Sequence, residues 1–213
     1  MSFLSRLFGN SDSAGSPKDI DAELTRLERE AENAHPGYVG TAFNKAGDLA
    51  LKAGQGERAV SYYGRAIDAF LEDRQRELAR GVANKIIRVR PSAIRTLCTL
   101  TWLDLAAQHQ AMALLHLRDY ARAAEDGGVG IRAATQVYGM ARISADSQFV
   151  EAAADTLDMF GFPNRAREVR RWTVGQGSPG AISDEEELNN ACLEAAIRSN
   201  DNEAELITDE PAG

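Results

Sequence analysis

Three side chains between residues 98 and 116 are of types that bind metal ions or haem. Cys98, His109 and His116 are spaced eleven and then seven residues apart, so they share one stripe if residues 92–117 form a single helix. Because a helix rises ~1.5 Å per residue, such neighbours are more than ~10 Å apart and cannot ligate one ion by themselves. Zinc sites also contain closely spaced ligand pairs. We therefore expect a core stripe with histidines at its edge, no metal and no cofactor.

Two glycine-rich stretches have the composition of phosphate-binding loops. Gly175, Gly177 and Gly180 spell G-x-G-x-x-G, but they follow a predicted helix instead of a strand and enclose Pro179. Residues 127–130 read GGVG and lack the Lys-Ser or Lys-Thr of a phosphate loop. We also find no serine elbow, no paired catalytic carboxylates and no compact Cys–His set. The sequence therefore predicts a protein that is not an enzyme.

Basic side chains gather between residues 74 and 95. Spacings of three and four residues place several of them on a shared helix face. One interpretation, which we favour, is a solvated surface balanced by Glu72, Asp73 and Glu77. The other is a dock for an acidic peptide, including the chain's own tail. With the two histidines, the candidate partner-binding residues are Arg74, Arg76, Arg80, Lys85, Arg88, His109 and His116.

Composition and charge narrow the class of protein. The chain has 213 residues, 44% of them hydrophobic and 26% charged, with much alanine and few β-branched residues. From Asp184 onward ten acids face one base, so the tail carries −9 and the remainder is close to neutral. A neutral body argues against nucleic-acid binding. With no signal peptide in the sequence and two widely separated cysteines, we expect a soluble, mostly helical, cytoplasmic protein.

Hydrophobic periodicity predicts an all-α domain over residues 17–174. Residues 1–16 form a flexible segment with a short amphipathic tip, which either touches a membrane weakly or packs on the domain. Helices are expected over 16–34, 38–53, 57–71, 74–89, 119–138, 146–160 and 164–173. Residues 92–117 form one long helix or two short ones broken near residue 108. In the 74–89 helix we expect Leu78, Val82 and Ile86 on one face.

Residues 40–73 resemble a tetratricopeptide repeat. Small residues stand where two helices of a hairpin must approach closely, and larger ones where gaps need filling; the matching positions are Phe43, Gly47, Ala50, Ala59, Tyr63 and Ala66. Weaker echoes lie at Asp119–Tyr120 with Ala123 and at Leu157, Gly161 and Ala166. The resemblance implies antiparallel helical hairpins in an α-solenoid or irregular array. It also implies a non-catalytic adaptor, scaffold or assembly factor that binds a peptide or helix of another protein in a groove.

The residue pattern of the C-terminal region predicts a separate helix after a linker at 175–182. Ser183 and Glu186 form a capping box that opens a helix over 184–198, within an acidic tail of 183–213. A stripe suited to docking follows at Leu188, Cys192, Ala195 and Ala196. This helix either folds back as an intramolecular cap or is itself a ligand for another protein. Residues from 199 onward are expected to be disordered.

Two alternative functions stay open at this point. The first is a peripheral membrane assembly factor that uses the N-terminal tip. The second is a helical regulator with a small-molecule pocket near residues 127–130, where three glycines interrupt an expected helix.

Overall fold

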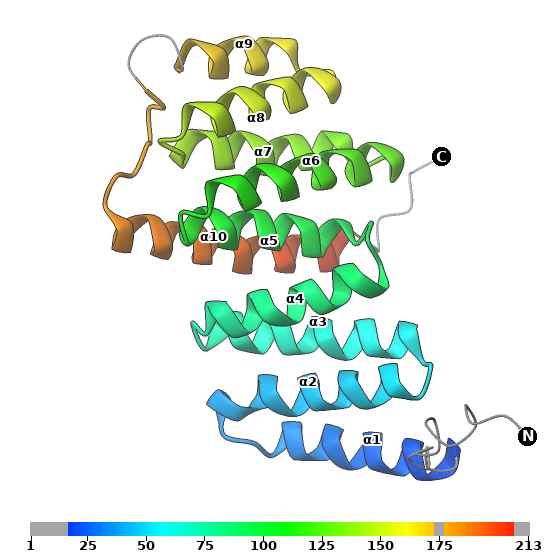
Figure 1. Cartoon of the computed structure of the whole chain (residues 1–213). Coiled ribbons are helices and arrows are strands. Elements are labelled where there is room, and N and C mark those ends of the chain that lie inside the picture. Colours follow the sequence, from blue (N-terminus) through cyan, green and yellow to red (C-terminus); the bar gives the residue numbers. More distant parts are fainter. Residues whose placement is uncertain (1–16, 173–176, 207–213) are drawn as a thin grey trace, which may run out of the picture.

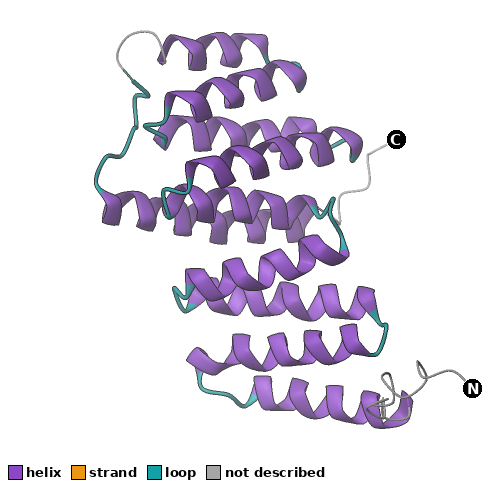
Figure 2. Cartoon of the chain, in the orientation of Figure 1, coloured by secondary structure: helices purple, strands orange, loops and turns teal. Residues whose placement is uncertain are grey.

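The computed structural model describes residues 17–172 and 177–206. These residues form ten α-helices and contain no strand (Figures 1 and 2). The helices are α1 Pro17–Glu32, α2 Pro36–Lys52, α3 Gly56–Glu72, α4 Arg76–Val89, α5 Ile94–Ala106, α6 Gln110–Asp126, α7 Gly130–Ile143, α8 Ser147–Met159, α9 Pro163–Arg171 and α10 Glu185–Leu206. Neighbouring helices pack on one another along the chain, which confirms the predicted all-α helical array.

Five of the connections share one turn geometry. In each, a single residue adopts left-handed backbone angles, with φ between +54° and +82°; these residues are Gly54, Arg74, Gln108, Gly128 and Gly161. The following N–H then reaches back to the last helical turn, as when Gln55 donates to the Ala50 carbonyl at 2.9 Å. This is the Schellman arrangement, which satisfies carbonyls that a helix end leaves without partners. The turns therefore stop each helix and reverse the direction of the chain.

These turns recur with a period of three helices. Gly54 and Gln108 are 54 residues apart, as are Arg74 and Gly128. The fully buried Ala59, Ala113 and Ala166 occupy the same place in the second helix of successive units. The units are α2–α4, α5–α7 and α8–α9, so the structural period is longer than the ~34 residues of a tetratricopeptide unit.

The expected hairpin at 40–73 is formed by α2 and α3, which pack closely through small residues. A Cβ added to Gly47 would lie 2.5 Å from the Tyr63 ring, and one added to Gly40 would lie 2.6 Å from Phe70. Ala66 is fully buried. The helix axes are therefore as near to each other as side chains permit.

Several boundaries differ from the sequence expectations. Residues 92–117 belong to two helices, because the chain turns at Gln108. The expected helix over 119–138 is wrong, since residues 127–129 form a turn between α6 and α7. The echo at Asp119–Tyr120 consequently lies inside α6 instead of at a turn. Leu78 is half-exposed, and Ala79 takes the buried position on α4.

The C-terminal helix departs from the order of the array. Residues 177–183 run along the end of α7, where Ser178 Oγ donates to the Ala141 carbonyl and the Ile182 N–H donates to the Ile143 carbonyl. α10 then lies beside α5, antiparallel to it, and also reaches α3 (Figure 1). Its N-cap is Asp184, one residue after the expected Ser183, because the Asp184 carboxylate accepts from the Glu187 N–H.

α10 is also longer than expected. The helix continues to Leu206, so the expectation of disorder from residue 199 is wrong for the described part of the tail. The expected N-terminal tip lies outside the described residues. Among the described helices, none is long and apolar enough to cross a bilayer.

Candidate functional site

A carboxylate is buried at the centre of the molecule. Asp104 lies near the end of α5, and its side chain is fully buried. The positions equivalent to Asp104 in the other two units of the array hold buried apolar side chains, which are Ala50 on α2 and Leu157 on α8. An ionised carboxylate in such a place needs charged or hydrogen-bonding partners, because desolvation without them is costly.

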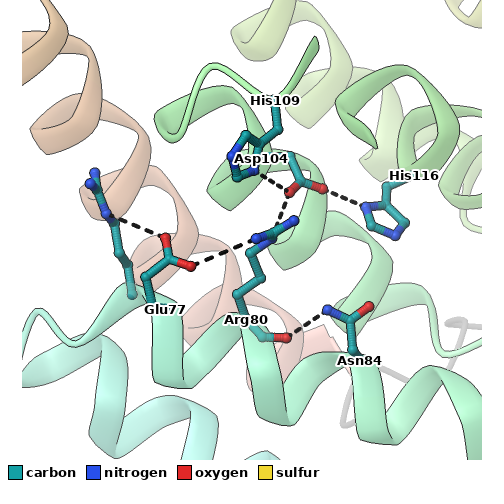
Figure 3. Close-up of polar contacts among 7 residues, drawn as sticks. Glu77, Arg80, Asn84, Asp104, His109 and His116 are labelled. Atoms are coloured by element: carbon teal, nitrogen blue, oxygen red, sulfur yellow. Dashed lines mark hydrogen bonds and ion pairs between the residues drawn. The ribbon is translucent and has the colours of Figure 1, made fainter. Parts of the chain in front are cut away.

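Basic side chains from two neighbouring helices supply these partners (Figure 3). Arg80 Nε on α4 donates to Asp104 Oδ1 at 2.8 Å, and His116 Nδ1 on α6 lies 2.6 Å from Oδ2. His109 Nδ1, at the start of α6, is 3.7 Å from Oδ1. All three basic side chains therefore lie within ion-pair distance of this one carboxyl group. Asp104 thus joins α4, α5 and α6.

A second layer of polar contacts holds Arg80 in place. Its Nη1 atom lies 3.6 Å from Glu77 Oε2, and its backbone carbonyl accepts from Asn84 Nδ2 at 2.9 Å (Figure 3). Three residues that the sequence analysis singled out, Arg80, His109 and His116, therefore meet at an acid that it missed. The available signal was an aspartate that is the single charged residue in the run 97–107.

A cavity of about 240 Å³ lies next to Asp104. Its walls come from three parts of the chain that are distant in sequence. These are the α5–α6 turn, the α7–α8 turn and the start of the C-terminal helix, through Asp104, Leu105, Gln108, Gln110, Ser144, Ala145, Asp146, Ile182, Ser183 and Leu188. The beginning of α10 therefore closes one side of this cavity.

α10 covers α5 with a narrow apolar face. Leu188, Cys192 and Ala196 are buried, as the stripe predicts, and Leu193 is buried beside them. Ala195, the other member of the predicted stripe, is only partly buried against the core. Burial raises the pKa of the Cys192 thiol to about 12, because the thiolate would lose its hydration.

The remaining candidate residues do not form one surface. Arg74 Nη1 donates to Asn190 Oδ1 of α10 at 3.2 Å, so this arginine meets an amide of the tail helix. Lys85 points to α2, where its Nζ lies 2.6 Å from Asp48 Oδ1. Arg76 Nε is 3.8 Å from Glu77 Oε1, and Arg88 is exposed. The basic cluster is therefore divided between a core network, two helix contacts and solvent.

The carboxyl group of Asp104 is engaged by its neighbours in the fold. Asp104 already accepts from Arg80 and His116. Within the described residues, no group of three His, Cys, Asp or Glu side chains could hold a metal ion. No family model, curated protein or solved structure matches this chain.

Proposed function

We propose that this chain is a non-catalytic protein-interaction module that holds an amphipathic helix in the groove along α5. One observation carries the proposal: α10, which is not part of the repeating array, is seated on α5 with three side chains at four-residue intervals buried. An amphipathic helix laid into an apolar groove is a common mode of peptide recognition. The resemblance of residues 40–73 to a tetratricopeptide repeat supports the same function.

The physical properties of α10 support this interpretation of the groove. In proteins, most of the stability of a helix comes from tertiary packing of its apolar face and less from intrinsic helix propensity. The buried face of α10 is narrow, and its first turn carries Glu185, Glu186 and Glu187. A helix from another protein with the same character would find the same contacts. We place the module in the cytoplasm, because its two cysteines are buried thiols typical of a reducing compartment.

A ligand-sensing regulator is the second candidate, and the cavity beside Asp104 is the observation that favours it. The expected pocket near residues 127–130 stays a prediction; these residues hold a turn and the start of α7, where Gly127 lies against Ile94 and Gly130 against Phe160. A small-molecule sensor would show a rise in melting temperature with a cognate ligand. The membrane alternative depends on residues outside the described part of the chain, and liposome flotation with and without residues 1–10 tests it.

Site-specific photo-crosslinking in the native cells tests the proposed function. A photo-reactive amino acid replaces Gln110, an exposed residue at the rim of the cavity. The matched control places it at Lys45, an exposed residue on α2. We expect a discrete protein adduct from position 110 and none from position 45, followed by identification of the partner by mass spectrometry. Equal adducts at both positions, or none at either, would contradict the proposal.

A further inference from the structure

We infer that α10 is an internal competitor for the α5 groove, and that the groove selects partner helices with small side chains at two successive turns. The inference rests on the proposed function and names both the regulation and the partner class of that site. The occupant to be displaced is α10 itself, and the partner is an amphipathic helix with the pattern leucine, small residue, small residue at four-residue intervals.

The size selection follows from the burial along α10. Leu188, Cys192 and Ala196 succeed one another every four residues and are 8%, 0% and 0% exposed. Two of the three are small, and neither leaves room for a longer side chain without moving the helix away from α5. Interiors are close-packed, so a larger residue there forces strain or separation. A partner helix must therefore carry small residues at the positions of Cys192 and Ala196.

The attachment of α10 makes exchange feasible. The other helices follow one another through short turns, whereas α10 follows a segment that begins after Trp172 and ends at Asp184. Along residues 177–183, Ser178 and Ile182 hold this segment to α7 through two hydrogen bonds. The segment can keep its place while α10 leaves the groove, because both hydrogen bonds precede the helix.

The junction of α10 with the α3–α4 turn is incompletely satisfied. Arg74 donates to Asn190 there. Next to these two residues, Asp73 Oδ2 and Asn189 Oδ1 are buried and have no hydrogen-bond partner among the described residues. A buried acceptor without a donor weakens the state that contains it. A partner helix that buries no unsatisfied acceptor at the position of Asn189 would therefore compete well against α10.

A peptide of residues 183–206 with a fluorescent label is the probe that tests the inference. Its affinity is measured for the full-length wild type, for Leu188→Asp, which weakens the resident helix, and for Arg198→Ala, an exposed position on the same helix as a control. If the resident helix masks the groove, apparent affinity rises with the fraction of open molecules, so Leu188→Asp should bind at least about tenfold more tightly than wild type. Arg198→Ala should bind like wild type.

Two further arms make the result decisive. A peptide carrying Ala196→Leu should lose binding to the Leu188→Asp protein, and one carrying Asn189→Ala, which removes the unsatisfied oxygen, should bind at least as tightly as the unmodified peptide. If Leu188→Asp misfolds, as shown by its circular dichroism melt, the milder Leu188→Ala replaces it. Equal affinities for wild type and the weakened protein, or indifference to Ala196→Leu, would overturn the inference. In that case position 110 would still give adducts in the crosslinking experiment. Failure of this inference can therefore be distinguished from failure of the proposed function.

Discussion

At the scale of single residues, the fold depends on an acid in the core. Asp104 is buried where the equivalent helices carry Ala50 and Leu157, and it accepts from Arg80 and His116. Such a network adds no apolar contact, yet removing Asp104 deprives Arg80 and His116 of a hydrogen-bond partner. Its effect is to fix the relative positions of α4, α5 and α6, of which α5 and α6 border the cavity.

The first prediction concerns this acid. Asp104→Asn keeps the shape of the side chain but removes the negative charge opposite Arg80, whose side chain is 24% exposed and keeps Glu77 as a second ion partner. We expect the free energy of unfolding to fall by about 1–3 kcal/mol, the scale of losing a hydrogen bond to a charged group inside a protein. Urea denaturation monitored by circular dichroism gives the value. Asp126→Asn, at an exposed position at the end of α6, is the matched control and should change stability by less than about 0.5 kcal/mol.

A second prediction at this scale concerns the thiol of Cys192. Its pKa is about 12 when α10 is docked, against an ordinary value of 9.0. Above pH 9 the unfolded chain releases the thiol proton while the native chain retains it, so stability is present below pH 9 and is lost as the pH rises towards 12. From pH 7.5 to pH 10 the wild type should lose about 1.4 kcal/mol more than Cys192→Ala does, measured by urea denaturation. Identical pH dependence of the two proteins would contradict burial of this thiol.

At the scale of helices and turns, one turn geometry sets the arrangement. Gly54, Gly128 and Gly161 suit the left-handed position, whereas Gln108 adopts φ +54° there despite its side chain. Sequence analysis predicts the glycine at 161 as a helix stop. It cannot choose between one helix and two at residue 108, because glutamine gives no turn signal. It misreads residues 127–130 because a glycine run inside an alanine-rich stretch fits a weak helix as well as a turn.

The Gln108 turn leads to a stabilising substitution. Gln108→Gly removes the Cβ that disfavours left-handed angles, as in the equivalent turns. Relief of the left-handed strain stabilises the folded chain, and the greater freedom of glycine in the unfolded chain offsets part of this gain. We expect the free energy of unfolding to rise by about 0.5–1 kcal/mol as the net result. Gln110→Gly, two residues later in the first turn of α6, is the control and should not stabilise the protein. A loss of stability in Gln108→Gly would show that its side chain contributes more than its backbone angles cost.

Helix packing gives a prediction for the α2–α3 hairpin. Ala66 is fully buried on α3, the helix whose Tyr63 ring fills the space at Gly47. Ala66→Leu should therefore overpack the core and lower the free energy of unfolding by about 1–3 kcal/mol. Thermal melts of the variants give this value. Ala111→Leu, at an exposed position on α6, is the control and should have nearly the stability of the wild type.

At the scale of the whole molecule, α10 connects parts that the repeating turns do not connect. It packs on α5 and α3 and so spans the first two three-helix units, while its start closes the cavity beside Asp104. The amphipathic stripe on this helix is readable from the sequence. Its position is not, because the surface that it covers exists only once α3 and α5 are assembled. The meeting of Arg80, His109 and His116 at Asp104 is hidden from the sequence for the same reason.

Alkylation of Cys192 in the wild-type chain tests the central claim, that α10 occupies a groove open to other helices. A labelling reagent is applied with and without a saturating peptide of residues 183–206 in which Cys192 is replaced by alanine. Peptide mapping by mass spectrometry follows Cys192, with Cys98 on α5 as the internal reference. Displacement of α10 should accelerate labelling of Cys192 by about tenfold or more, because the buried thiol becomes exposed. Labelling of Cys192 at the same slow rate with and without the peptide would contradict the account.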